Sequence, residues 1–328
     1  MKNTLKSIFI GLIGLTAINL PLQAMNPNNI EETLKTIINK NKTPKEVQEP
    51  VQNWLANNKE LVKKMTNPEV CINLKNFIEL KKYIQNNKLT DLSTYSYSIK
   101  INNLILRFGG PLHYRENINA HWGRPWGTAV TQEDYQKFVK EHGDSFYQNT
   151  SRFTNWFNYK NVIDDKKLDQ LDTPKCYMVE IPGTSGNICD KTYCIVETAL
   201  QDSVPLDQAI ENITMETLGQ LYTAIKEVEV WDTANPENIR MTKDKKFVCV
   251  DLEQPNSTSP AEFLNTPLWR HWHNVFCGAE GLYKNLEKAG KVELCAKLKE
   301  WAKKDLAEAS KNVNMSEERL CGFFANMK

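Results

Sequence analysis

Hydrophobic side chains recur along much of this chain at the spacing of amphipathic helices. Between residues 214 and 228 the apolar positions follow one another every three or four residues, at Leu218, Leu221, Tyr222, Ile225 and Val228. This periodicity predicts a helix with one buried face. Thr214 precedes the pattern and belongs to the residue types that commonly cap helix N-termini. The spacing of Leu294, Leu298 and Trp301 predicts another helix near the C-terminus.

Shorter apolar runs before residue 200 are typical of strands. Residues 175–182 and 191–200 are rich in β-branched and aromatic side chains, and a segment with Gly, Ser and Asn joins them. Together they predict a β-hairpin. Residues 95–108 predict two further strands with a turn at Asn102–Asn103, and residues 151–162 predict a helix between the two strand pairs.

The segment from residue 25 to 94 is polar, with apolar stripes at helical spacing such as Val47, Val51 and Trp54. We expect a small helical subdomain that packs on the main body of the protein. Pro50 is expected to mark a helix break or a first turn, because proline lacks the backbone N–H that a helix interior requires.

The predicted elements divide the rest of the chain into two parts. Residues 95–200 mix strands and one helix, with an insertion around residues 121–138. Residues 201–328 are mostly helical and contain a polar loop segment at 230–253. The fold class that this pattern predicts is α+β.

The N-terminus has the three-part pattern of a secretory signal peptide. Lys2 and Lys6 are followed by an apolar run of 14 residues, and the segment ends in the small residue Ala24. We expect cleavage after Ala24, so that residues 1–24 are a signal peptide and the protein is exported, to the periplasm or the medium. An uncleaved anchor is the alternative, although the run is shorter than the roughly 20 residues of a membrane span. No membrane span is expected in the mature chain.

The charges of the chain are nearly balanced. The chain has 41 Lys and Arg residues against 40 Asp and Glu residues. A nearly neutral chain gives no reason to expect nucleic-acid binding. The abundance of Asn, Lys and Ile is typical of an AT-rich bacterial genome.

The cysteines and histidines do not form a recognisable metal motif. Eight cysteines occur without a C-x-x-C pair, and an exported protein with an even number could form disulfides. Cys176, Cys189 and Cys194 lie in one predicted hairpin, which leaves a local bridge and simple core packing both open. His271 and His273 are two residues apart in an aromatic segment that predicts a helix, where such side chains point apart.

The candidate chemistry lies between residues 230 and 253. Asp232 opens a loop, Asn238 ends the sequence Pro-Glu-Asn after it, and Asp251 follows a predicted strand at residues 247–250. Asn238 and Asp251 are 13 residues apart. Carboxylate and amide oxygens are suitable ligands for Mg²⁺.

This segment resembles the catalytic loop and metal-binding strand end of the kinase-like superfamily of protein kinases and small-molecule phosphotransferases. The sequence Pro-Glu-Asn-Ile, the 13-residue spacing and the order of predicted elements carry the resemblance. It implies a bilobal fold, with a β-rich N-lobe at residues 95–200 and a helical C-lobe at 201–328. It also implies that Asp232 is the catalytic base, that Asn238 and Asp251 hold Mg²⁺ with ATP, and that Arg107 stands at the phosphate-binding strand position.

The chain departs from the family pattern at several points. No His precedes Asp232, and Asp232 lies six residues before Asn238, where the family has five, so that an ungapped alignment places Thr233 at the base position. No glycine-rich phosphate loop occurs, and the helix predicted at residues 151–162 contains no Glu to pair with a strand cation. Lys100 is a second candidate for that cation, and either residue could instead simply end a strand at the surface.

Two classes of function remain open from the sequence. One is a divergent, exported bacterial kinase-like protein, either a pseudokinase with residual magnesium–nucleotide binding or an atypical phosphotransferase acting on an unknown protein or small molecule. The other is a non-catalytic extracytoplasmic binding or structural protein.

Overall fold

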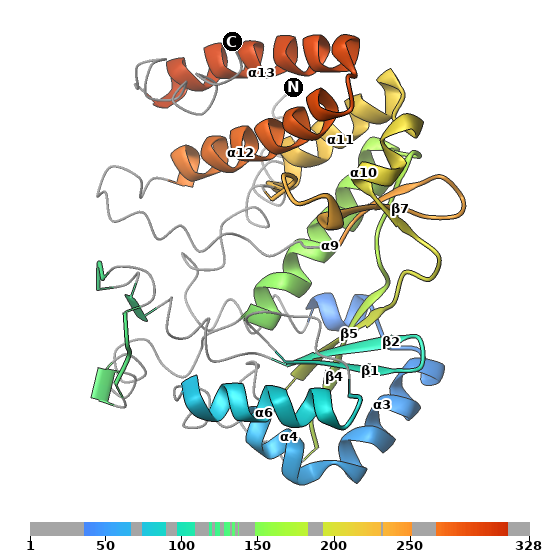
Figure 1. Ribbon diagram of the computed structural model, residues 1–328, viewed down its shortest axis with the longest axis vertical. Coiled ribbons are helices and arrows are strands. Elements are labelled where there is room, and N and C mark those ends of the chain that lie inside the picture. The colour runs from blue at the N-terminus through green and yellow to red at the C-terminus, as the bar shows by residue number, and fades with distance from the viewer. Residues whose placement is uncertain are drawn as a thin grey trace, which may run out of the picture.

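The computed structural model describes residues 36–66, 74–89, 97–108, 118–119, 122–124, 128–131, 133–134, 137, 148–182, 193–230, 232–250 and 267–313. These residues form an α+β structure with two four-stranded sheets and helices packed around them (Figure 1). The elements follow one another in the predicted order, which is a strand pair, a helix, a hairpin, a helix, a loop with a strand, and two long helices.

The first sheet contains both strand pairs predicted from the sequence. Its strands are β1 (Tyr97–Ile101), β2 (Leu104–Phe108), β4 (Cys176–Glu180) and β5 (Tyr193–Thr198). They are antiparallel and lie in the order β1-β2-β5-β4. The turn between β1 and β2 is at Asn102–Asn103, as predicted, and Asn102 has a φ of 53°, a left-handed conformation that Asn tolerates.

Three N-terminal helices share a hydrophobic core with this sheet. They are α3 (Lys45–Asn57), α4 (Lys59–Thr66) and α6 (Leu74–Asn86), and Figure 1 shows them beside the sheet. Val51, Met65 and Ile84 are fully buried in the same apolar cluster as strand residues of the sheet. The predicted helical stretch is thus part of a common core. The expectation for Pro50 was wrong, because Pro50 lies inside α3, where it removes one helical N–H close to the N-terminus.

Helix α9 (Gln148–Lys166) connects the two sheets (Figure 1). It includes the helix predicted at residues 151–162 and is longer at both ends. Phe153 lies in the core, and Trp156 Nε1 donates to the carbonyl of Pro174, just before β4. Three residues further along the helix, Tyr159 Oη donates to Cys249 Sγ at 3.3 Å, in the second sheet.

The second sheet is small and lies next to the candidate loop. Its strands are β3 (Leu171–Asp172), β6 (Val204–Pro205), β7 (Ile239–Met241) and β8 (Phe247–Cys249), in the order β3-β8-β7-β6. β3 pairs with β8 in parallel, and β7 pairs with both β8 and β6 in antiparallel fashion. The predicted strand at 247–250 is therefore the second half of a hairpin that begins directly after Asn238.

Helices make up most of the remaining described structure. They are α10 (Leu206–Ala209), η2 (Ile210–Asn212), α11 (Met215–Val228), α12 (Pro267–Lys288) and α13 (Val292–Val313). The Thr214 side chain accepts a hydrogen bond from Thr217 N at 3.1 Å, which confirms the predicted cap of α11. In Figure 1, α11, α12 and α13 lie against one another at the end of the molecule opposite α3, α4 and α6.

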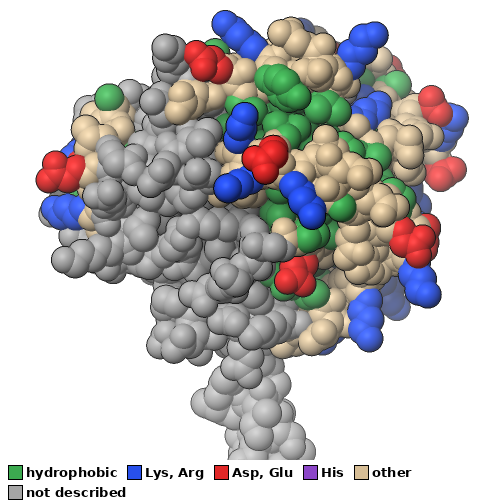
Figure 2. All heavy atoms as spheres, turned by 90° about the horizontal axis from the view of Figure 1, so that it is seen from below, with side chains coloured by type: hydrophobic (Ala, Val, Ile, Leu, Met, Phe, Trp, Pro, Cys, Tyr) green, Lys and Arg blue, Asp and Glu red, His purple; other side chains and the backbone are tan. Residues whose placement is uncertain are grey.

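The surface of the described part carries mixed charge. Figure 2 shows Lys and Arg side chains interspersed with Asp and Glu side chains over the coloured part of one face. Among the described helices, none is both long and apolar enough to cross a membrane.

Candidate functional site

The candidate loop, residues 232–238, joins α11 to β7 and ends in a short helical turn, η3 (Pro236–Asn238). Asn238 is buried, with 8% of its surface exposed. Its side-chain Nδ2 donates to two oxygens of Asp232, the backbone carbonyl at 2.9 Å and the carboxylate Oδ2 at 3.0 Å. Two of the three residues predicted from this segment are therefore in direct contact.

These two hydrogen bonds fix the orientation of the Asn238 amide. With Nδ2 directed at the oxygens of Asp232, the amide Oδ1 lies on the other side of the group. Asn235 Nδ2 is 3.4 Å from this oxygen, which is a long hydrogen bond. Asn238 therefore presents the kind of atom that coordinates Mg²⁺.

The backbone of Asn238 also binds the end of the β8 segment. Val250 N donates to the carbonyl of Asn238 at 3.0 Å, in continuation of the β7–β8 ladder that pairs Ile239 with Cys249. Val250 directly precedes Asp251, the other predicted metal ligand, which itself lies outside the described residues.

Thr233 is fully buried and cannot act as a base towards a substrate. Its Oγ1 donates to the carbonyl of Gly278 in α12, and its own carbonyl accepts from Asn285 Nδ2 at 2.9 Å. Glycine is required in α12 at this contact. A Cβ at Gly278 would lie 2.2 Å from the carbonyl oxygen of Val230, and a Cβ at Gly281 would lie 2.4 Å from the N of the residue after Thr233.

Another contact between α11 and α12 lies just before the loop. Glu229 has a left-handed backbone with a φ of 60°, and its carboxylate binds two residues of α12. His271 Nδ1 lies 3.1 Å from Glu229 Oε1, and Asn274 Nδ2 donates to Oε2 at 2.7 Å. The predicted helix around His271 is confirmed, and this histidine contacts a carboxylate. Among the described residues, no group of three His, Cys, Asp or Glu side chains could hold a metal ion.

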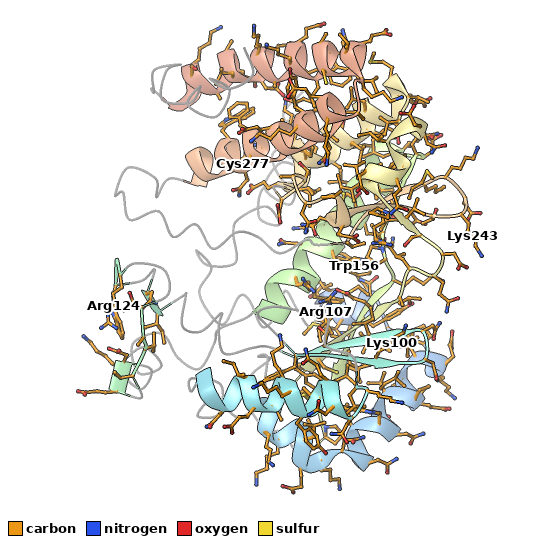
Figure 3. The ribbon with its side chains drawn as sticks, viewed as in Figure 1. Lys100, Arg107, Arg124, Trp156, Lys243 and Cys277 are labelled. Carbon is orange, nitrogen blue, oxygen red and sulfur yellow. The ribbon has the colours of Figure 1, made fainter. Side chains whose placement is uncertain are left out.

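Arg107 belongs to a buried charge cluster on the first sheet. Its Nε lies 2.8 Å from Glu197 Oε2, and Arg152 Nη1 of α9 lies 3.6 Å from the other carboxylate oxygen. The three side chains are 8–16% exposed. We call Arg107, Arg152 and Glu197 the arginine cluster. In Figure 3 Arg107 lies near Trp156 of α9, in the middle of the molecule, whereas Lys100 lies towards the β1–β2 turn and is exposed.

Sequence reasoning missed two members of this cluster. The resemblance places a carboxylate on the helix as the partner of the strand cation, and residues 151–162 contain no Glu. In the structure the carboxylate comes from β5, as Glu197, and the helix contributes the second cation, Arg152. The available signal was a Glu within the apolar strand Tyr-Cys-Ile-Val-Glu-Thr, since a charged side chain in a buried strand usually has a partner.

Three cysteines on strands of the two sheets, Cys176, Cys194 and Cys249, are buried. Burial, and next the negative charge of Glu197, raise the pKa of the Cys176 thiol well above its ordinary value. Burial raises the pKa of Cys249 to about 11. Both cysteines are free, and so is Cys194, while Cys189 lies outside the described residues. These thiols remain protonated near neutral pH.

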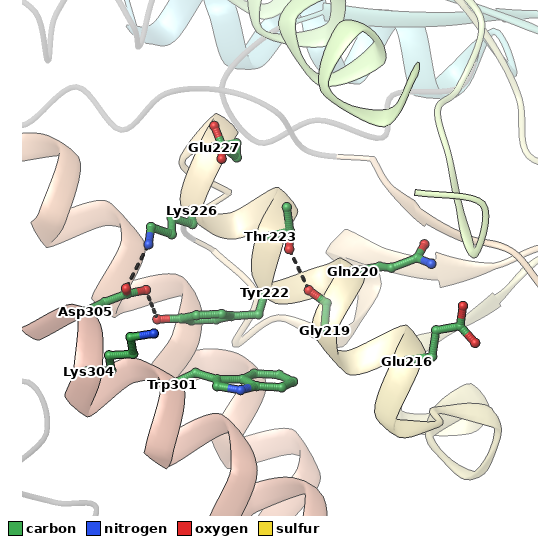
Figure 4. Close-up of a pocket in the computed structure, with 10 residues that line it drawn as sticks. All are labelled: Glu216, Gly219, Gln220, Tyr222, Thr223, Lys226, Glu227, Trp301, Lys304 and Asp305. Atoms are coloured by element: carbon green, nitrogen blue, oxygen red, sulfur yellow. Dashed lines mark hydrogen bonds and ion pairs between the residues drawn. The ribbon is translucent and has the colours of Figure 1, made fainter. Parts of the chain in front are cut away.

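A hollow of about 580 Å³ lies elsewhere, between α11 and α13 (Figure 4). The rings of Tyr222 and Trp301 stack there with centroids 5.8 Å apart. Asp305 accepts hydrogen bonds from Tyr222 Oη and Lys226 Nζ, both at 2.8 Å. Burial, followed by the charge of Asp305, raises the pKa of Tyr222. None of the residues predicted as site residues lines this hollow.

No protein-family model matches the chain, and no curated protein matches it.

Proposed function

We propose that this chain is a divergent, exported kinase-like protein that binds a magnesium–nucleotide complex and catalyses little or no phosphoryl transfer. The observation that carries this proposal is the setting of Asn238. Its amide is oriented by Asp232, and its backbone carbonyl binds Val250, the residue before Asp251. A metal that touches both predicted ligands requires their oxygens to lie within a few ångströms of one another.

The order of elements supports a bilobal arrangement. The first sheet, with α9 packed on it, corresponds to the N-lobe that the resemblance implies. The helices α11, α12 and α13, with the candidate loop, correspond to the C-lobe. In such an arrangement the nucleotide lies between the lobes, and the connection from β5 to β6 is the hinge.

Each candidate residue has a distinct part in this proposal. Asn238 supplies an amide oxygen and Asp251 a carboxylate to Mg²⁺. Arg107 carries positive charge on the first sheet, and the arginine cluster as a whole, with two guanidinium groups and one carboxylate, carries a charge of +1. Arginine suits phosphate oxygens because its donors form a planar fork. Magnesium, when bound, would neutralise phosphate charge.

Low turnover follows from the position of Asp232. Its carboxylate accepts a hydrogen bond from Asn238, and it lies one residue away from the family's base position. Thr233, at that position in an ungapped alignment, is buried and bound to α12. The loss of a general base commonly costs about 10²–10⁴ in rate.

Thermal stabilisation by ATP with Mg²⁺ tests this proposal. We expect ATP and Mg²⁺ together to raise the melting temperature of the wild type, and Asp251→Ala to abolish that rise. At saturating Mg²⁺, Asp232→Ala should leave the size of this rise nearly unchanged, because the backbone carbonyl of Asp232 still accepts from Asn238. Asp244→Ala, in the exposed β7–β8 turn, is the matched control.

Two results would contradict the proposal. No stabilisation of the wild type by ATP and Mg²⁺ would favour a non-catalytic binding or structural protein. Rapid phosphoryl transfer that Asp232→Ala eliminates would show that Asp232 is an efficient base despite its displaced position.

Export is the second part of the proposal, and it rests on the pattern of residues 1–24 alone. N-terminal sequencing of the mature protein from its native host should begin at or near Met25. A cytosolic protein that retains Met1 would contradict export without affecting the proposed nucleotide binding.

A further inference from the structure

The segment that precedes Asn238 is attached to α12 through one residue. Thr233 donates its hydroxyl hydrogen to the carbonyl of Gly278, and its backbone carbonyl accepts from Asn285. The glycines at 278 and 281 allow the loop backbone to approach the helix more closely than any other residue would permit. Thr233 is thus held by both its side chain and its backbone.

Asp232, the neighbour of Thr233, carries the two oxygens that orient Asn238. If the Asn238 amide were turned by 180°, Oδ1 would face these two oxygens and lose both hydrogen bonds. The orientation of the amide therefore depends on where the backbone of Asp232 lies, and that backbone is fixed by the attachment of Thr233 to α12.

We infer that Thr233 is a positioning residue for the proposed magnesium site, which it serves through Asp232 and Asn238. This inference rests on the proposed function. The hydroxyl of Thr233 contributes no atom to the metal, because it is buried and directed at α12. Its effect is to keep Asn238 Oδ1, which accepts only a long hydrogen bond of 3.4 Å from Asn235 among the described residues, turned away from Asp232 as a ligand. Hydrogen bonds that orient a metal ligand commonly change metal affinity by about 10–100-fold.

The experiment compares Thr233→Val, which keeps the branched shape and loses the hydroxyl, with Thr233→Ser, which keeps the hydroxyl. Melting temperature is measured at one fixed concentration of ATP while Mg²⁺ is varied, and also without ATP. We expect Thr233→Val to raise the Mg²⁺ concentration that gives half-maximal stabilisation by about 10–100-fold. Thr233→Ser should stay close to the wild type. A purely structural role would lower the melting temperature without ATP and leave this Mg²⁺ concentration unchanged.

The possible outcomes separate this inference from the proposed function. If the wild type is stabilised by ATP and Mg²⁺ and Thr233→Val has the same Mg²⁺ dependence, the inference is wrong and the proposed function stands. If the wild type shows no Mg²⁺-dependent stabilisation by ATP, both are wrong.

Asn285→Ala serves as a second variant if Thr233→Val does not fold. It removes the hydrogen bond to the carbonyl of Thr233 and leaves the hydroxyl in place. We expect a shift of the Mg²⁺ dependence in the same direction and smaller than that of Thr233→Val. An unchanged Mg²⁺ dependence in this variant would also overturn the inference.

Discussion

The arginine cluster and two residues of the candidate loop, Thr233 and Asn238, are buried polar groups, yet they are stabilised by different interactions. In the arginine cluster two guanidinium groups share the carboxylate of Glu197, which is 10% exposed. In the candidate loop Thr233 and Asn238 are held mainly by hydrogen bonds to backbone carbonyls, with one more from Asn238 to the Asp232 carboxylate, and by the close approach of α12.

This difference determines how each region responds to a single substitution. Charges removed from water are costly unless they are paired, so the arginine cluster depends strongly on its shared carboxylate. The loop distributes its stabilisation over several hydrogen bonds, each of which contributes only about 0.5–1.5 kcal/mol. The positions most sensitive to substitution are Gly278 and Gly281 of α12, because a Cβ there would lie 2.2 Å and 2.4 Å from backbone atoms of the facing segment.

The largest expected effect is that of Glu197→Gln. This substitution keeps the shape of the side chain and removes the negative charge that Arg107 and Arg152 share. Breaking a buried ion pair by changing one partner costs about 3–5 kcal/mol. We therefore expect the free energy of unfolding, measured in urea, to fall by about this amount.

The matched control is Glu180→Gln at the exposed end of β4 in the same sheet. Surface substitutions of this kind usually change stability by less than about 0.5 kcal/mol. If both variants were equally stable, other groups would have to compensate the guanidinium charges, and the contrast between the two regions would disappear.

Local patterns in the sequence predicted much of the fold. The two strand pairs, the turn at Asn102–Asn103 and helix α11 with its Thr214 cap were all predicted correctly. Each depends on residues close together in the chain, where periodicity and capping act. In the loop, Asn238 was identified by its neighbours Pro236 and Glu237 and its spacing from Asp251.

Contacts between distant segments could not be predicted in this way. Glu197 meets Arg107 because β5 lies next to β2, and strand order is not visible in local periodicity. The attachment of Thr233 to α12 joins residues 45 positions apart. Nothing in the sequence around Gly278 shows that a loop backbone lies against it. The sequence indicated which residue types the loop contains. It did not show that α12 is the element that holds the loop in place.

A smaller effect is expected for Gly278→Ala, and it tests the loop side of the comparison. The added methyl group would lie 2.2 Å from the carbonyl oxygen of Val230 and 2.9 Å from Ile225 Cγ2, so the loop or α12 must move. Overpacking of this kind costs about 1–3 kcal/mol. Alanine's higher helix propensity recovers up to about 1 kcal/mol of this.

Gly219→Ala in α11 is the matched control, because its methyl group would meet only Trp301 Cη2 at an ordinary 3.6 Å. We expect urea unfolding to show Gly278→Ala less stable than the wild type and Gly219→Ala equally or more stable. Equal stabilisation by both substitutions would mean that the loop does not lie tightly against α12, and the attachment argued for Thr233 would fail with it.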